Sequence, residues 1–454
     1  MTGATKPTPT APALKPNDLD AHFMPFTAQT SFKKKPRMLT GAKGMYYYSD
    51  DGRQLLDASA GLWCVNAGHN HPKIVEAIRK QAGELDYAPN FSFGHPLAFQ
   101  AASLLCAQMP GDIDHVFFSN SGSEAVDTAV KIALGYQRLR GKGTKTKIIS
   151  RERAYHGVNM CGVSLGGIPY NRKMFSGGLM PNVDFLPHTH NLAKNAFSKG
   201  LPEHGAELAD TLESIIQLHD AENVAAVIVE PVAGSTGVLV PPKGYLEKLR
   251  AICDKYDVLL IFDEVITGWG RLGKATAAER FNIMPDIITM AKGINSGTVP
   301  MGATFMRKAI YDAFAGGGEY AINFMHGYTY SGHPLACAAA LATQEVYKEE
   351  GLFEKSAAME KKWQDALHTL KGAPHVIDVR NCGMMGGVEL DPGVRNTPHE
   401  MSRAMETFDR LYWEQDVVMR FTLNTLAMSP PLIINESQID EIVSKIRKAL
   451  EKVK

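Results

Sequence analysis

Short apolar runs and segments with helical spacing alternate through the middle of this 454-residue chain. The runs read HVFF, KIIS, AAVIV, VLLIF, DIITM and ATFM, and they occupy residues 115–118, 147–150, 225–229, 258–262, 286–290 and 303–306. Several of them lack polar alternation, which is typical of strands covered on both faces. The alternation of strands and helices predicts an α/β fold with a mostly parallel central sheet flanked by helices.

Three further segments carry helix signals. Residues 72–85 and 244–256 repeat apolar positions on one face, and the first of them opens with Pro72, a residue favoured at the first helical position. A final amphipathic helix is expected to begin at Asn435, with Gln438 in the capping-box position.

The length of the chain and the change of pattern along it predict two domains. Residues 75–335 form the expected large domain. Residues 17–74 and 336–454 are expected to build a smaller α+β domain together. Residues 1–16 are rich in Thr, Pro, Ala and Lys and are interpreted as a disordered leader.

Charge and cysteine content exclude several classes of partner. The 48 basic residues balance the 48 acidic ones, so the net charge favours neither nucleic acid nor an anionic membrane surface. No apolar stretch approaches the roughly 18 residues of a membrane span, and the six cysteines form no CxxC pair. Because the sequence also lacks a signal-peptide core, we expect a cytoplasmic protein.

Ser121, Gly122 and Ser123 lie where a strand gives way to helical spacing. Small residues at a helix N-terminus leave backbone N–H groups and hydroxyls directed at one point, where the helix dipole is positive. Such an end binds a phosphate or a carboxylate. An ordinary serine N-cap is the simpler interpretation, and it is favoured for this segment taken alone.

The next strand to carry chemistry ends in two carboxylates, Asp263 and Glu264. The carboxyl ends of parallel strands are where α/β sheets bind ligands, although both residues could instead cap the segment that follows. Gly268, Gly270 and Gly273 also match the dinucleotide spacing G-x-G-x-x-G. That interpretation fails, because the two carboxylates separate the glycines from the strand and would repel a pyrophosphate.

Lys292 directly follows another apolar strand and precedes a Gly/Ser-rich loop. Burial at a strand end lowers the pKa of a lysine and makes its neutral amine available, whereas a lysine reaching to solvent is the simpler alternative. The three segments together match pyridoxal phosphate (PLP). The serine-rich cradle would bind its phosphate, Asp263 would keep its pyridine nitrogen protonated, and Lys292 would hold its aldehyde as a Schiff base.

LLIFDEVITGWGRLG at residues 259–273, with AKGI at 291–294, resembles the signature of the class III (ω-) aminotransferases of PLP fold type I. Blocks along most of the chain support this resemblance, among them RAYHG, VEPVAGSTGV and HGYTYSGHPLACAAAL. Within the family the chain is most similar to the ω-amino acid:pyruvate (β-alanine:pyruvate) group. The resemblance implies a transaminase that moves an amino group from an ω-amino acid or amine to pyruvate, giving an aldehyde or ketone plus L-alanine.

The resemblance also assigns a set of residues to PLP, namely Ser121, Gly122, Ser123, Tyr155, His156, Glu230, Asp263, Val265, Lys292 and Thr329. Tyr155 would stack on one face of the ring, with His156 beside it, and Val265 would pack on the other face. Glu230 would lie nearby in the pocket. Thr329 would reach the cofactor phosphate of a neighbouring subunit, which implies a homodimer or homotetramer with active sites at the interface.

The substrate residues implied by the resemblance are Trp63, Phe91, Tyr155, Ala233 and Arg420. Arg420 would bind a substrate carboxylate. Ornithine- and GABA-type members carry a Gln and a Glu in the block where this chain has Ala233 and Ser235. Arg420 would therefore lack an internal carboxylate partner, so we hypothesise that it swings aside for donors without an α-carboxylate and returns to bind pyruvate.

The histidines do not predict a metal site. His188 and His190 form a lone HxH in a polar loop, with no carboxylate or cysteine partner expected. His69, His71, His95 and His333 lie in turns and are interpreted as structural. Three alternatives stay open on the sequence alone: a class III enzyme with another donor or acceptor, an aminomutase or decarboxylase, and a non-catalytic PLP-binding protein.

Overall fold

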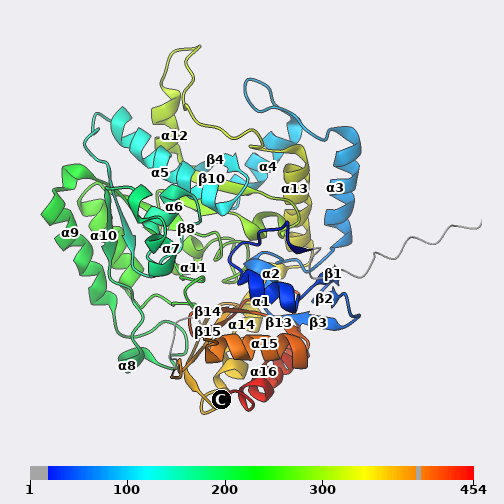
Figure 1. Ribbon diagram of the computed structural model, residues 1–454. Helices are drawn as coiled ribbons and strands as arrows, with labels where there is room; N and C mark the ends of the chain where they lie inside the picture. The colour runs from blue at the N-terminus through cyan, green and yellow to red at the C-terminus, as the bar shows by residue number, and fades with distance from the viewer. Residues whose placement is uncertain (1–18, 395–399) are drawn as a thin grey trace, which may run out of the picture.

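The computed structural model describes residues 19–394 and 400–454 (Figure 1). The leader expected at residues 1–16 lies outside the described residues. Within the described part of the chain, no helix has the length and apolar character needed to cross a membrane.

A seven-stranded sheet forms the centre of the larger half of the molecule, in the order β4-β10-β9-β8-β7-β5-β6. Its strands are β4 (Ile113–Ser119), β5 (Lys147–Arg151), β6 (Val183–Leu186), β7 (Val224–Val229), β8 (Leu259–Asp263), β9 (Ile287–Met290) and β10 (Gly302–Arg307). Neighbours from β6 to β9 run parallel, whereas β10 is antiparallel to both β9 and β4. The expected mostly parallel sheet is confirmed, with β6 as an additional edge strand.

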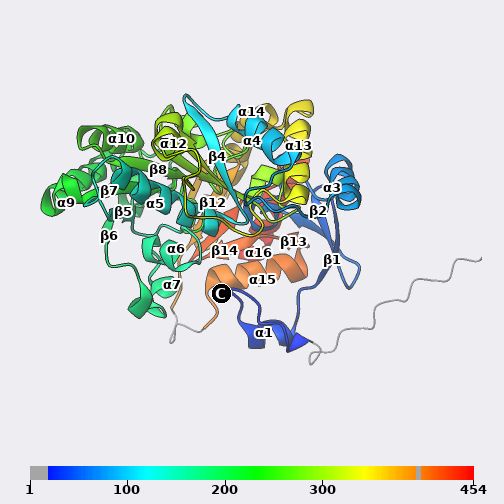
Figure 2. The same cartoon turned by 90° about the horizontal axis from the view of Figure 1, so that it is seen from above.

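The strand β8 shows why its sequence lacks polar alternation. Leu259 and Ile261 face one apolar core, which they share with helix α5 (Gly122–Leu139). Leu260 and Phe262 face the opposite core, which includes apolar residues of α10 (Tyr245–Lys255). Helices thus cover both faces of the sheet, as Figure 2 shows from above, and every residue of the strand is buried.

Helices α3 (Pro72–Glu84), α4 (Pro96–Cys106) and α13 (Pro334–Glu349) pack together beside the sheet (Figure 1). Two of the three predicted helices, α3 and α10, match their expected ranges to within two residues at each end. Further helices are α1 (Gln29–Lys34), α2 (Ala60–Trp63), α6 (Met160–Leu165), α7 (Pro169–Lys173), α8 (Leu192–Asn195), α9 (Thr211–His219), α11 (Ala277–Phe281) and α12 (Lys308–Ala315).

The smaller half of the molecule contains two four-stranded sheets. One has the order β1-β2-β3-β13 and the other β11-β12-β15-β14. Their strands are β1 (Leu39–Lys43), β2 (Tyr46–Ser49), β3 (Gln54–Asp57), β11 (Val376–Cys382), β12 (Met385–Leu390), β13 (Val417–Val418), β14 (Arg420–Thr422) and β15 (Thr425–Met428). The parallel pair β3–β13 joins an N-terminal segment to a C-terminal one, as the two-part small domain requires. The predicted domain bounds themselves stay a prediction.

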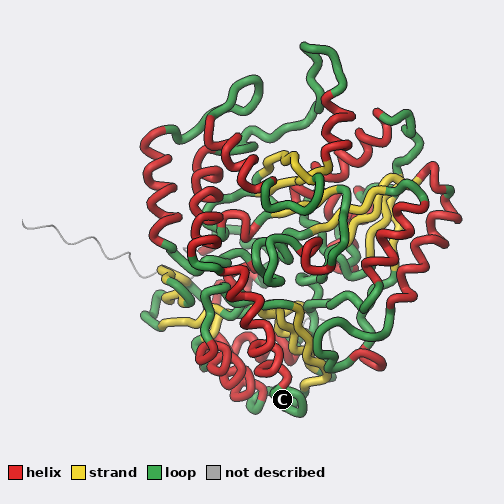
Figure 3. The backbone as a smooth tube through the Cα atoms, turned by 180° about the vertical axis from the view of Figure 1, so that it is seen from behind, coloured by secondary structure: helices red, strands yellow, loops and turns green. Residues whose placement is uncertain are grey.

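Helices α14 (Leu352–His368), α15 (Arg403–Glu414) and α16 (Glu436–Leu450) lie with these smaller sheets at the lower end of the molecule in Figure 1. The capping box predicted for the last helix is confirmed: the Gln438 N–H donates to Oδ1 of Asn435 at 2.9 Å, and the Asn435 N–H donates to Oε1 of Gln438 at 3.1 Å. Loops occupy much of the region between the two groups of strands (Figure 3).

Candidate active site

The carboxyl ends of several strands of the central sheet open on one cavity of about 610 Å³. This is the position and size expected of a ligand site in an α/β fold. Ten of the predicted site residues line it: Trp63, Gly122, Ser123, Tyr155, His156, Glu230, Asp263, Val265, Lys292 and Arg420. They come from both halves of the chain, so the fold brings together segments that are distant in the sequence.

The start of α5 supplies the expected cradle. Ser121 is the N-cap, and its hydroxyl accepts a hydrogen bond from the Glu124 N–H, so the simple capping interpretation holds for this side chain. Gly122 and Ser123, in the first turn, line the cavity. A Cβ on Gly122 would lie 2.9 Å from Cγ1 of Val265, so the glycine allows the helix end to approach the opposite wall. The backbone N–H groups at the start of a helix are donors of the kind that bind anions.

Asp263 is fixed by three contacts at the end of β8. Its Oδ2 lies 2.7 Å from Nδ1 of His156. Its Oδ1 accepts from the Val265 N–H and from the hydroxyl of Thr289, both at 3.2 Å. The Asp263 and His156 side chains are buried, and Nε2 of His156 has no hydrogen-bond partner among the described residues. The site thus holds a carboxylate in low dielectric, ready for a cationic partner.

Glu230 directly follows β7 and is buried in the cavity wall. Its Oε1 accepts a hydrogen bond from the Tyr155 N–H at 3.0 Å. Burial raises the pKa of Glu230 to about 7, and the neighbouring Asp263 acts in the same direction. Glu230 therefore both anchors the backbone of Tyr155 and titrates near neutral pH.

Lys292 follows β9 in a left-handed conformation, with φ of +49°. A lysine in this region of φ/ψ space is uncommon and costs free energy, which is typical of functional sites. Burial lowers the pKa of Lys292 to about 8. A substantial fraction of the amine is therefore neutral, and nucleophilic, just above neutral pH.

Another part of the cavity wall carries Arg420, the first residue of β14. Its side chain is partly exposed, but desolvation by the surrounding protein lowers its pKa. Among the described residues no carboxylate forms an ion pair with it. Ser235 also lines the cavity, and its carbonyl accepts a hydrogen bond from the Thr422 hydroxyl at 2.6 Å. This part of the cavity therefore offers a guanidinium for a carboxylate that comes from outside the protein.

The sequence did not predict several residues that line the cavity. Residues that line the cavity but were not predicted include Pro25, Phe26, Thr27, Leu62, Ile168, Tyr170, Thr236 and Leu423. Most of them lie in irregular segments, where apolar residues follow no period that could mark them. Phe26 and Tyr170 are about three-quarters exposed, at 75% and 74%, so the mouth of the cavity is apolar in this chain.

Four predicted residues do not line the cavity of their own chain: Ser121, which caps α5 next to Gly122, and Ala233, Phe91 and Thr329. Ala233 is buried, and its backbone pairs with that of Leu239. Phe91 and Thr329 are exposed at the surface, where their segments touch: the hydroxyl of Tyr87 donates to the Thr329 carbonyl at 3.1 Å.

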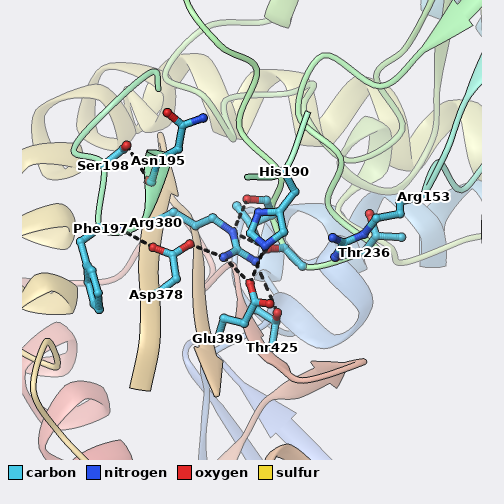
Figure 4. A network of polar contacts seen from close by, with 12 residues as sticks. Arg153, His190, Asn195, Phe197, Ser198, Thr236, Asp378, Arg380, Glu389 and Thr425 are labelled. Atoms are coloured by element: carbon cyan, nitrogen blue, oxygen red, sulfur yellow. Dashed lines mark hydrogen bonds and ion pairs between the residues drawn. The ribbon is translucent and has the colours of Figure 1, made fainter. Parts of the chain in front are cut away.

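The expectation that His190 has no carboxylate partner is wrong. Nε2 of His190 lies 3.0 Å from Oε2 of Glu389, so this histidine does have a carboxylate partner (Figure 4). The sequence could not show this, because Glu389 lies on β12, in a distant segment. The four turn histidines all bond to protein groups: His69 to Asp57, His71 to Glu350, His95 to the Gly332 carbonyl and His333 to the Leu335 N–H.

Comparison with known proteins agrees with this geometry. Residues 28–450 match the family described as aminotransferase class-III. The chain is 58% identical over 437 residues to an omega-aminotransferase of Caulobacter vibrioides, covering 96% of this chain and 98% of the relative. It is 46% identical over 441 residues to the beta-alanine–pyruvate aminotransferase of Pseudomonas aeruginosa, covering 95% and 96%.

The solved structures agree as well. The (S)-enantioselective omega-transaminase of Thermomicrobium roseum superposes with a TM-score of 0.90 at 33% identity, covering 98% of this chain and 99% of that one. The omega-transaminase of Pseudomonas jessenii in complex with PMP gives 0.90 at 32% identity, covering 97% and 98%. The fold and the site define an aminotransferase of PLP fold type I. The chain belongs to the class III aminotransferase family.

Proposed function

We propose that this protein is a PLP-dependent transaminase that moves an amino group from an ω-amino acid or amine of the β-alanine type to pyruvate. The observation that carries the proposal is one cavity lined by the buried amine of Lys292, the fixed carboxylate of Asp263 and the guanidinium of Arg420, which pairs with no carboxylate in the described part of the chain. The relatives support the choice of substrates, since two of them are named for β-alanine or ω-amino acids together with pyruvate.

The residues present fit PLP. The start of α5 offers N–H groups to a phosphate, and the missing side chain at Gly122 leaves room beside Val265. Asp263 provides a carboxylate for the pyridine nitrogen, and Lys292 an amine for the aldehyde. When bound, PLP supplies a carbonyl that takes up the amino group and a ring that accepts the electrons of the broken C–H bond.

Asp263 and His156 act together on the ring nitrogen. A carboxylate held in low dielectric favours a proton on a heteroaromatic nitrogen beside it. The His156 contact restricts the carboxylate to one orientation, so its charge is directed before the cofactor arrives. Preorganised charge of this kind costs no reorganisation during the reaction.

Lys292 moves the proton. Its neutral Nζ takes the proton from the substrate carbon that bears the nitrogen and holds it until it is returned. The lowered pKa of about 8 suits both directions, because the amine is then neither too weak a base nor too weak an acid near neutral pH.

Arg420 selects the acceptor. A guanidinium forms paired hydrogen bonds with a carboxylate, which fits the carboxylate of pyruvate or alanine. Because no acid among the described residues forms an ion pair with Arg420, a donor without a carboxylate at that place requires the side chain to turn aside. The apolar mouth of the cavity supports this, since it accepts the uncharged part of such a donor.

The decisive experiment follows the absorption spectrum of the PLP-reconstituted protein during addition of β-alanine and then pyruvate. The expected result is a yellow band that is lost with β-alanine and returns with pyruvate. A band that β-alanine leaves unchanged would support PLP binding but would contradict β-alanine as the amino donor. Transfer to another acceptor only, isomerisation of the amine, or release of CO₂ would identify one of the alternative class III chemistries.

We further propose a homodimer or homotetramer with its active sites at the subunit interface. The exposed and adjoining segments around Phe91 and Thr329 support it, because they carry predicted site residues that their own cavity does not use. Sedimentation analysis and a mixture of inactive Lys292→Ala with Thr329→Ala subunits test this: shared sites predict activity in the mixed oligomer that neither parent shows.

The six unpaired cysteines support a cytoplasmic location.

A further inference from the structure

A buried arginine on β11 lies behind one wall of the cavity. Arg380 is 6% exposed, and its guanidinium is surrounded by protein oxygens (Figure 4). Its Nε donates to the carbonyls of Gly237 and Val238, at 2.9 and 3.0 Å, and Nη2 donates to Gly237 again, at 2.6 Å. On its other side Nη1 bonds to Asp378 and Glu389.

The acidic groups around Arg380 are better explained as its partners than as metal ligands. Ligand atoms of His190, Asp378 and Glu389 lie within 4.8 Å of one another, a spacing that could hold a cation. Arg380 already donates to both carboxylates, so a metal ion there would lie beside a guanidinium and be repelled. The cluster fixes the orientation of Arg380.

The loop that Arg380 grips, residues 234–238, forms part of the cavity wall through Ser235 and Thr236. Val238 has φ of +58°, a strained conformation for a β-branched residue. A Cβ on Gly237 would lie 2.8 Å from Oγ1 of Thr425 and 3.2 Å from Nη2 of Arg380, so only glycine fits there. A strained loop persists only where its surroundings hold it, and the carbonyls bound by Arg380 are such a constraint.

The same loop contacts the hairpin that carries Arg420. The Thr422 hydroxyl donates to the Ser235 carbonyl at 2.6 Å, two residues along β14 from Arg420. Thr422 pairs across the hairpin with Thr425, whose hydroxyl accepts from Nη2 of Arg380 at 3.4 Å. Arg380 therefore contacts both the loop and the hairpin.

We propose that Arg380 is a positioning residue for substrate-carboxylate binding: it holds loop 234–238 against the β14–β15 hairpin and thereby fixes the backbone from which the Arg420 side chain reaches the cavity. The inference rests on the proposed function insofar as Arg420 binds the carboxylate of pyruvate. It goes further in making carboxylate affinity depend on a residue that touches neither substrate nor cofactor. Arg380 acts through backbone carbonyls, so the shape of its fork matters as well as its charge.

The test compares Arg380→Lys with Arg250→Lys in the holoenzyme. Lysine keeps a charge for the two buried acids but lacks the forked donors. Arg250, on α10, likewise bonds a backbone carbonyl and a buried acid, those of Met284 and Asp286, away from the cavity. Binding of propionate, an unreactive carboxylate, is measured by calorimetry, and the KM for pyruvate and kcat are measured separately.

Arg380→Lys is expected to weaken propionate binding and raise the pyruvate KM about tenfold, with kcat changed less than about twofold; one lost charged hydrogen bond has this size. Arg250→Lys is expected to lower the melting temperature without either effect. Equal propionate affinity in Arg380→Lys and wild type would overturn the proposal. Should Arg380→Lys not fold, Thr422→Val, which breaks the link to Ser235, must give the same loss of affinity, and unchanged affinity there overturns it.

Transamination itself is checked on the wild type. Loss of propionate affinity is measured without turnover, so failure of the proposed reaction and failure of this positioning role give different results. If the wild type binds propionate but does not use pyruvate, the proposed acceptor is wrong, and the positioning role of Arg380 is unaffected.

Discussion

Nδ1 of His156 lies 2.7 Å from Oδ2 of Asp263, and this contact joins the ends of two strands that are not neighbours. His156 follows β5 and Asp263 ends β8, with β7 between them in the sheet. The bond therefore spans the carboxyl ends of three adjacent strands, where both residues line the cavity. It fixes the orientation of the carboxylate within the cavity wall.

Two replacements of His156 should distinguish the effect of its hydrogen bond to Asp263 from the effect of its side-chain shape. In His156→Asn the amide nitrogen can take the place of Nδ1, whereas His156→Leu removes the donor. We expect His156→Leu to raise the PLP Kd about 10- to 100-fold, which is the usual effect of losing a hydrogen bond to a charged group. His156→Asn should raise the PLP Kd much less. Fluorescence titration of the apoenzyme measures both. Equal losses in the two variants would mean that the bond to Asp263 does not contribute.

The lowered pKa of Lys292 predicts how fast the apoenzyme captures PLP. Only the neutral amine attacks an aldehyde, and its fraction grows as the pH rises toward about 8. The capture rate should rise about tenfold per pH unit below that value and level off above it. Stopped-flow absorbance follows the reaction. A rise that continues to the ordinary lysine pKa of 10.5 would contradict the effect of burial.

Lys292→Ala is the companion variant. It should bind PLP only reversibly, so gel filtration removes the cofactor, and transamination should be abolished. Lys255→Ala, a change at an exposed lysine on α10, serves as the control and should retain both the covalent attachment and the rate profile. Catalytic turnover in Lys292→Ala would refute the assignment of this residue.

Gly122 and Val265 should behave as a coupled pair. The methyl group of Gly122→Ala would lie 2.9 Å from Cγ1 of Val265 and force one wall outward. Overpacking of about 1–3 kcal/mol corresponds to a PLP Kd about 5- to 150-fold higher. Adding Val265→Ala restores space, so the double variant should bind PLP better than Gly122→Ala. Additive losses in a double-mutant cycle would show that the two positions do not meet.

Arg420→Ala should affect the two half-reactions unequally. Loss of a charged hydrogen bond to the pyruvate carboxylate is expected to slow the pyruvate half-reaction about 10- to 100-fold at limiting pyruvate. A donor amine without a carboxylate should react at close to the wild-type rate, because it does not use the guanidinium. Single-turnover absorbance separates the two steps. A pyruvate half-reaction as fast as in the wild type would rule out this role for Arg420.

The sequence predicted the parts of the site that lie at strand ends. Asp263 and Lys292 directly follow long apolar runs, and the sheet brings such positions together by its parallel order alone. The strand β6 was missed because it has four residues, one of them the polar Asp184, at an edge of the sheet. A short partly polar run does not differ from a loop in its pattern.

The contacts between distant loops could not be predicted in this way. The partner of His190 lies on β12, and the carbonyls bound by Arg380 lie after β7, so no local spacing relates these residues. Phe26 and Leu423 at the cavity mouth have left-handed φ angles of +47° and +51°, and periodic patterns do not describe such backbone. Site residues supplied by a second chain, as proposed for Thr329, lie beyond the reach of any single-chain pattern.

The parallel pairing of β3 with β13 has a consequence for the order in which the protein is made. Leu56 pairs with Val417, three residues before Arg420, so an early strand must wait for nearly the whole chain to leave the ribosome. Contacts of such long sequence separation form late and slowly. The nascent chain can therefore assemble the central sheet, with Asp263 and Lys292 in it, before β14 and its Arg420 have been synthesised. A carboxylate site that depends on Arg420 therefore forms only after residue 420 has been synthesised, later than the strands that carry Asp263 and Lys292.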